Sequence, residues 1–206
     1  MKIKTVAAVL SVICLVVSAA MIPSMCIALF DRTHDALSFG ISMLAGIAVS
    51  VLLRLSSGQK SLSGLSMGIR EGVGVTGFSW IIASAVGALP YWLNGAGYTD
   101  AFFEAVSGFT TTGATIMTDI ESLPRGILLW RSLTHWMGGM GIIVLSLAVL
   151  PFLGVTGMEM YKAEVPGITA EKITPRLHQT AIYLWGVYVF LTLRVRFPDV
   201  RRNELV

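Results

Sequence analysis

The chain has 206 residues, of which 54% are hydrophobic and only 13% are charged, and its mean hydropathy is +0.75. Soluble domains average about 25% charged residues, so this composition excludes a disordered chain and argues against a water-soluble fold. The net charge of +3 comes from scattered basic residues, which is not the pattern of a nucleic-acid-binding protein. The two cysteines, Cys14 and Cys26, lie in one apolar run, so neither a disulfide framework nor a metal cluster is indicated.

Apolar segments of membrane-spanning length follow one another along the chain. A transmembrane helix needs about 20 mostly apolar residues. Segments that lack Asp, Glu, Lys and Arg cover residues 6–30, 36–53, 72–99 and 132–158. A fifth apolar segment, residues 181–193, has about half the length of a span. The sequence therefore predicts an all-α membrane protein with four to five transmembrane helices, two of them within residues 1–55.

The first apolar segment has a second interpretation. Lys2 and Lys4, the apolar run and the small residues 18–20 resemble a cleavable signal peptide. The apolar run continues beyond that point to Phe30, which favours an uncleaved helix.

The basic residues between the segments predict the orientation, because cytoplasmic loops are rich in Lys and Arg. With a cytoplasmic N-terminus, eight basic residues fall inside: Lys2, Lys4, Arg54, Lys60, Arg70, Lys162, Lys172 and Arg176. Arg32 and Arg125 fall outside. We therefore expect a multi-pass protein of the cell inner membrane. The tail, residues 194–206, does not fit this excess of basic residues on the cytoplasmic side. If residues 181–193 crossed the membrane outward, the arginines of the tail would lie outside.

The segment between the third and fourth spans carries the most specific pattern. Thr99 can cap a helix, Asp100 suits its first turn, and Gly108 can end it after about half a membrane thickness. An uncharged stretch of five residues follows, Thr110, Thr111, Thr112, Gly113 and Ala114. The pattern predicts a re-entrant pore half-helix followed by a filter loop. An ordinary Thr-rich external loop is the alternative.

The residue types in this stretch suit the selection of an alkali cation. Backbone carbonyls can replace the water around a potassium ion when the chain is extended and bears no bulky side chain. Gly113 permits the φ values that turn a carbonyl inward, and threonine favours extended chain. The negative dipole end of the half-helix would favour a cation. Thr111, Thr112 and Gly113 are the predicted potassium ligands through their backbone oxygens.

Two longer motifs resemble the TrkH-type potassium-uptake proteins of the Trk/Ktr/HKT superfamily. Residues 100–115, DAFFEAVSGFTTTGAT, are similar to the family's first pore loop, and residues 130–145, WRSLTHWMGGMGIIVL, to the helix after it. Residues 161–167 and 174–176 match the following cytoplasmic connector.

The resemblance implies an ion-transporting function and an architecture. It implies four repeats of helix, pore loop and helix, preceded by two extra helices. Residues 72–153 would then form the first repeat, and residues 154–193 the cytoplasmic connector and the start of the second. It also implies potassium as the transported ion, a homodimer at full length and a cytosolic nucleotide-binding regulatory subunit. No organic cofactor and no nucleic acid is implied.

The chain also departs from the family. It has one filter segment where the family needs four, and residues from about Arg194 onward do not resemble it. A truncated or frame-shifted reading frame would explain both features. The sequence therefore also allows a non-conducting truncated remnant, or a small accessory or assembly membrane protein.

Charged and glycine-rich positions outside the filter invite simpler interpretations. Arg131 is expected to snorkel or to pair with Glu104 or Asp119. His135 is expected to have a hydrogen-bonded packing role, with pH sensing as the alternative. Glu104 is expected to be a structural acceptor, and the alternative is that it raises the local cation concentration. Residues 72–77 match G-x-G-x-x-G but lack the preceding strand of a dinucleotide site, so these glycines are expected to allow close helix packing, as are Gly138, Gly139 and Gly141. No enzymatic motif is present, and we predict that the protein is not an enzyme.

Overall fold

The computed structural model describes residues 3–58, 69–153 and 182–194. For residues 69–70 and 142–153 it describes the backbone alone. The chain divides into two compact units, Met1–Gly139 and Met140–Val206. Every element in the described part of the chain is helical. The connector, residues 154–181, and the end of the tail, residues 195–206, lie outside the described residues, so the predictions for them are not addressed.

The first unit begins with an interrupted hairpin. α1 (Ile3–Ala20) and α2 (Ile22–Asp31) together occupy the segment predicted as one helix. Pro23 lies in the first turn of α2, and proline removes a backbone donor and clashes with the preceding turn, so the helix breaks just before it. The chain then reverses through Arg32, whose φ is +55°, into α3 (Asp35–Ser57).

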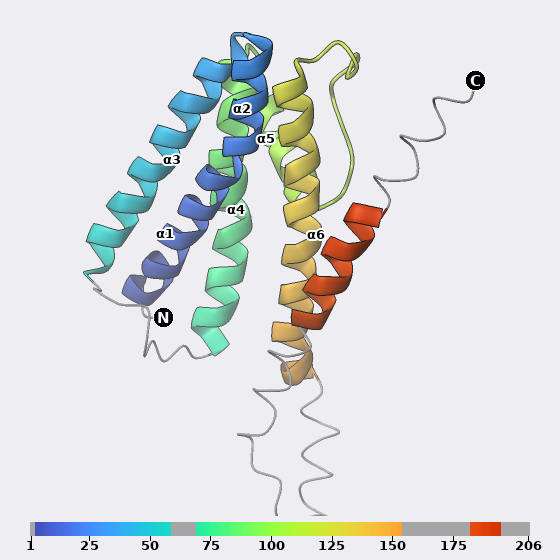
Figure 1. The fold of residues 1–206 in the computed structure, drawn as a ribbon. Helices are drawn as coiled ribbons and strands as arrows, with labels where there is room; N and C mark the ends of the chain where they lie inside the picture. The colour runs from blue at the N-terminus through green and yellow to red at the C-terminus, as the bar shows by residue number, and fades with distance from the viewer. Residues whose placement is uncertain (1–2, 59–68, 154–181, 195–206) are drawn as a thin grey trace, which may run out of the picture. The chain divides into compact units, whose positions relative to one another are not determined.

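The remaining helices of this unit carry the predicted pore loop. α4 (Ile69–Leu93) is followed by the short α5 (Tyr98–Phe109) and then by the first part of α6 (Arg125–Leu153). α1 packs against both α3 and α4, and α5 packs against α4. Figure 1 shows α1, α3 and α4 side by side, with α5 and the following loop between α4 and α6.

Small residues bring α1 and α3 into close contact. The Ser50 hydroxyl donates a hydrogen bond to the carbonyl oxygen of Ser11, at 2.6 Å. A Cβ on Gly46 would overlap the hydroxyl of Ser18. Close backbone approach through Gly and Ser is the usual means of helix association in lipid, where apolar burial provides no driving force.

Within the part of the chain that the structure describes, three helical segments are long and apolar enough to cross a membrane, namely Ile3–Asp31, Asp35–Ser57 and Glu71–Leu93. Large apolar side chains point away from the bundle, including Phe30 (86% exposed) and Leu44 (69% exposed). The protein is an all-α membrane protein. The fourth predicted span falls on α6, and the helix Ile182–Arg194 of the second unit is apolar but shorter than a span, as the sequence predicted.

Candidate functional site

α5 is a half-helix, as predicted. Its 12 residues correspond to about 18 Å, little more than half of the hydrocarbon thickness. Two details of the prediction were wrong. The helix begins at Tyr98 after Gly97, so Thr99 is not its cap, and it continues to Phe109, one residue beyond Gly108.

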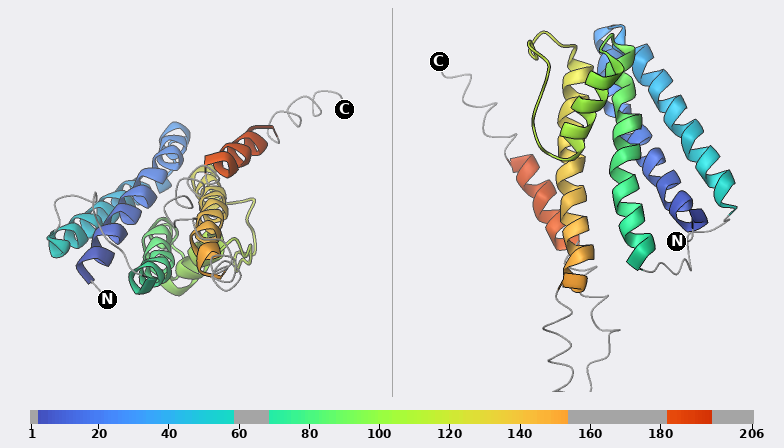
Figure 2. Two further views of the ribbon diagram at one scale, coloured as in Figure 1. Left: turned by 90° about the horizontal axis from the view of Figure 1, so that it is seen from below. Right: turned by 180° about the vertical axis from the view of Figure 1, so that it is seen from behind.

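The chain after α5 returns toward the end of the unit at which α5 began. Figure 1 and the right-hand view of Figure 2 show this loop leaving the inner end of α5 beside α6 and rising to the start of α6. At the turn, the N–H of Thr111 donates to the carbonyl of Gly108 and the N–H of Thr112 to that of Ser107, both at 3.0 Å. A half-helix followed by a non-helical segment that returns to the same end of the unit is the arrangement of a re-entrant loop.

Two residues at this turn have left-handed backbone conformations. Gly113 has φ +75°, and Thr111 has φ +57°. A positive φ suits glycine but is strained for a β-branched residue. The turn therefore holds an unfavourable backbone conformation, a feature typical of sites where neighbouring structure sets the chain for function.

The five predicted filter residues lie on an open surface of the unit. Thr110, Thr111, Thr112, Gly113 and Ala114 are all exposed, and a Cβ on Gly113 would meet nothing within 4 Å. The carbonyl of Ala114 already accepts a hydrogen bond from the Ser107 hydroxyl at 2.6 Å, and that of Thr110 accepts one from the Thr111 hydroxyl. Within the described residues, the carbonyls of Thr111, Thr112 and Gly113 accept none, so these three oxygens are available to a ligand.

A buried carboxylate holds the loop where it leaves the turn. Glu104, in the middle of α5, is 1% exposed. Its Oε1 accepts hydrogen bonds from the hydroxyl of Thr115 and, at 2.8 Å, from the backbone N–H of Ile116. Its Oε2 lies 3.4 Å from Nε of Arg131 on α6. These contacts confirm the expected role of Glu104 as a structural acceptor, and of the alternatives expected for Arg131 the structure shows the pair with Glu104.

Arg131 and His135 occupy successive turns of α6. The Arg131 side chain is 19% exposed, so it pairs within the protein instead of snorkelling into water. Nδ1 of His135 lies 2.8 Å from the carbonyl oxygen of Arg131, which can only accept, so Nδ1 carries the proton. This contact confirms the hydrogen-bonded packing role of His135.

Glycines let α6 pass directly behind the end of α5. A Cβ on Gly138 would overlap the carbonyl oxygen of Phe109, and a Cβ on Gly108 would overlap the hydroxyl of Thr134. Close packing at Gly138 is therefore confirmed. The same expectation was wrong for Gly72 and Gly77, where an added Cβ would meet nothing within 4 Å. Residues 72–77 lie within helix α4.

Trp130 joins α6 to the rest of the unit in a way that the sequence did not reveal. It is fully buried, and its indole N–H donates to the carbonyl of Gly87 at 3.0 Å. Its ring also meets Phe39 edge-on, with 6.5 Å between centroids. Tryptophan is also common at membrane interfaces, so only the folded chain shows that Trp130 is enclosed.

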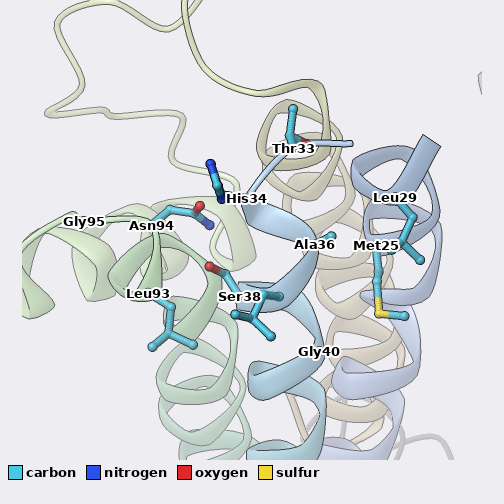
Figure 3. A pocket seen from close by; sticks show the side chains of 11 residues that line it. Met25, Leu29, Thr33, His34, Ala36, Ser38, Gly40, Leu93, Asn94 and Gly95 are labelled. Atoms are coloured by element: carbon cyan, nitrogen blue, oxygen red, sulfur yellow. The ribbon is translucent and has the colours of Figure 1, made fainter. Parts of the chain in front are cut away.

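Other candidate sites in the described residues are weaker. No group of three or more His, Cys, Asp or Glu side chains there could hold a metal ion, and Cys14 and Cys26 are unpaired thiols. An open pocket of about 840 Å³ lies between α2, α3 and the end of α4, lined by residues that include Met25, His34 and Asn94. Figure 3 shows this pocket. None of the filter residues lines it.

Comparison with known proteins places this arrangement in a family. The TrkH family model, described as a cation transport protein, matches residues 39–195. The chain is 37% identical to the Trk system potassium uptake protein TrkH of Halomonas elongata over 94% of its own length and 40% of that relative. It is 48% identical to TrkH of Escherichia coli K12 over 60% of its length and 26% of that relative.

A solved structure agrees with this assignment. The crystal structure of the potassium transporter TrkH from Vibrio parahaemolyticus matches with a TM-score of 0.76 and 28% identity, over 94% of this chain and 38% of that one. The chain therefore spans about two fifths or less of the length of these relatives. The family model covers well over half of the chain, and the chain belongs to the TrkH family of cation transport proteins.

Proposed function

We propose that this chain contributes a filter segment to a pathway for potassium uptake across the cell inner membrane. One observation carries the proposal. Thr111, Thr112 and Gly113 are exposed residues whose carbonyls accept no hydrogen bond within the described residues, while Thr110 and Ala114 on either side of them are hydrogen-bonded to α5. The relatives' names, which refer to potassium uptake, supply the ion.

In this mechanism the ion sheds its water and binds to backbone oxygens. Carbonyl dipoles at fixed positions compensate the lost hydration, so the loop must keep its shape while the ion is bound. The C-terminal end of α5 lies at the turn and carries a partial negative charge, which attracts a cation. No covalent step is required, and the protein acts as a transporter subunit.

One filter segment does not surround an ion. The family resemblance implies four such segments about one axis, and the described residues contain one. We therefore propose that the pathway is completed by segments outside the described residues or in other polypeptides. The exposed position of the filter residues is consistent with partners that cover them. A cytosolic nucleotide-binding subunit and a homodimer of complete membrane subunits belong to the same proposal.

A glycine substitution tests the filter assignment. Because 94% of the chain aligns with TrkH of Halomonas elongata, a chimera can carry the aligned part of this chain within that relative. Gly113→Ala should abolish potassium-dependent growth of an uptake-deficient host, because the αL conformation costs an alanine about 1 kcal/mol or more and the carbonyls would rotate. Insertion into the membrane should be normal.

The matched control for this experiment is Gly58→Ala. Gly58 also has a positive φ, of +63°, and open space around its Cα, so it suffers the same backbone strain outside the filter. We expect it to retain growth. Normal growth of the Gly113→Ala chimera, or equal loss in both variants, would contradict the filter assignment.

The 206-residue chain by itself provides a second test. We expect it to enter the membrane without restoring potassium-dependent growth, because a single filter segment leaves most of the ion's hydration uncompensated. Restored growth would show that copies of this chain assemble a pathway, and would exclude the non-conducting alternative.

A further inference from the structure

A buried acidic residue lies away from the filter, at the start of α3. Asp35 is 1% exposed, and within the described residues neither of its carboxylate oxygens has a hydrogen-bond partner. Removing a carboxylate from water is costly unless its surroundings compensate the charge. The position of Asp35 therefore requires an explanation.

Asp35 faces the beginning of α6. A Cβ on Gly126, the second residue of α6, would overlap Oδ2 of Asp35. The same Cβ would lie 3.1 Å from the carbonyl oxygen of Ser24 and 3.2 Å from Cβ of Ala28, both on α2. Three helices thus meet at Gly126, and only a residue without a side chain fits there. Figure 1 shows the ends of α2, α3 and α6 at one end of the unit.

The carboxylate lies at two helix N-termini that lack side-chain caps. In α6 the N–H of Leu128 donates to the carbonyl of Pro124 at 3.0 Å, so the preceding N–H groups have no partner within the helix. Pro124 has no side-chain acceptor to satisfy them. In α3, His34 makes no side-chain capping bond. Each N-terminus carries a partial positive charge, so the two together compensate one buried carboxylate.

We propose that Asp35 is a positioning residue whose buried charge holds the start of α6 against α2 and α3. The effect reaches the filter through α6, because Arg131 lies on the second turn of that helix and pairs with Glu104, which holds Thr115 and Ile116. The extension to the filter rests on the proposed function, whereas the attachment of α6 does not.

A nearby ion pair is the weaker of the two links. Arg125 and Asp31 approach to 3.1 Å, but the Arg125 side chain is 72% exposed, and exposed pairs contribute little. These two side chains therefore serve as a reporter of the distance between α2 and α6, not as the source of their association.

Disulfide formation in the full chain tests the attachment. In a background with Cys14→Ala and Cys26→Ser, the pair Asp31→Cys and Arg125→Cys is oxidised mildly in membranes. The remaining free thiols are then counted by the gel shift with a large maleimide. We expect Asp35→Asn to slow formation of this disulfide about five- to thirtyfold, as the loss of a favourable charge–dipole interaction implies. Gly126→Ala should also slow it, because the added Cβ would overlap Asp35 and push α6 away from α2 and α3.

Matched controls separate a shift of α6 from a loss of folding. A second pair, Ser11→Cys with Ser50→Cys, reports the contact between α1 and α3 and should form at an unchanged rate. Gly40→Ala, in open space, and Glu121→Gln, at an exposed position, should affect neither pair. An unchanged rate for the 31–125 pair in Asp35→Asn, or equal slowing of both pairs, would overturn the proposal.

The link to the filter has a separate measurement. In the chimera, Asp35→Asn should reduce the preference for potassium over sodium at least about threefold, a change that a uniform loss of protein would not produce. An unchanged ratio would overturn the extension to the filter. A chimera without potassium uptake would instead contradict the proposed function, and the disulfide measurement would still decide the role of Asp35.

Discussion

Single side chains at the edges of the filter loop hold its conformation. The Ser107 hydroxyl fixes the carbonyl of Ala114, and the Glu104 carboxylate fixes Thr115 and the N–H of Ile116. Among the residues that the structure describes, residues 110–113 form hydrogen bonds only with one another and with the last turn of α5. The loop is therefore restrained at both ends, and its middle is left open to a ligand.

Thr115→Val should destabilise the protein through this restraint. The two side chains have nearly the same size, but valine removes one of the two donors to Oε1 of the buried Glu104 carboxylate and leaves only the N–H of Ile116 there. Hydrogen bonds to charged groups contribute about 1.5–3 kcal/mol, so we expect the free energy of unfolding to fall by about that amount. Thermal unfolding of the purified chain in detergent measures it.

Thr118→Val is the matched control for this substitution. Thr118 lies on the same loop and is exposed, so its change to valine should shift the unfolding temperature very little. Equal shifts in the two variants would show that the hydrogen bond to Glu104 has no particular importance.

At the scale of elements, α6 supports the half-helix at two levels. Near its start, Trp130 and Arg131 connect it to α4 and α5 by hydrogen bonds. Two turns later, Gly138 lets the backbone of α6 touch the last residues of α5. Because α5 ends within the bundle, its free carbonyl end depends on this contact for its position.

Gly138→Ala should separate α6 from the end of α5. Its Cβ would meet backbone atoms of Phe109, which no change of rotamer can move aside. Overpacking of this kind costs about 1–3 kcal/mol, and thermal unfolding should show a loss of that size.

Gly77→Ala in α4 should stabilise the protein, whereas Gly138→Ala should destabilise it. Its Cβ would meet nothing within 4 Å, and alanine is favoured over glycine within a helix by about 1 kcal/mol. Destabilisation by Gly77→Ala as large as that by Gly138→Ala would contradict the packing argument.

At the scale of the whole molecule, the apolar surface and the loop charges set how the protein lies in a membrane. The bundle exposes large apolar side chains along α1, α2 and α3, as a lipid-facing surface does. Arg54 lies at the end of α3, and Lys60 and Arg70 follow it in the sequence. Positively charged loops stay in the cytoplasm, so the start of α5 should face outward.

Cysteine labelling of intact cells tests this orientation. In a background with Cys14→Ala and Cys26→Ser, a membrane-impermeant maleimide should label Thr99→Cys but not Ser56→Cys, both of which are exposed positions. Both should react after the cells are permeabilised. Labelling of Ser56→Cys alone in intact cells would mean that the chain has the reverse orientation.

The sequence by itself determined the membrane class, the positions of the helices and the half-helix with its loop. These features follow from local properties: charge-free runs of fixed length, and glycine and threonine where a helix must stop. The pair of Arg131 with Glu104 was one of the alternatives that the sequence allowed, beside snorkelling and a pair with Asp119, and the folded chain decided among them.

Only the tertiary structure decided which oxygens are free and which residues are enclosed. The sequence placed Ala114 in the filter stretch without naming it as a ligand, and the folded chain shows that its carbonyl accepts a hydrogen bond from Ser107. The sequence also treated Gly72 and Gly77 like Gly138, and it did not distinguish Asp35 or Trp130 from other residues near helix ends. Burial and close approach depend on which helices meet, and residues such as Asp35 and Gly126 come together only when distant segments pack, so no local pattern contains that information.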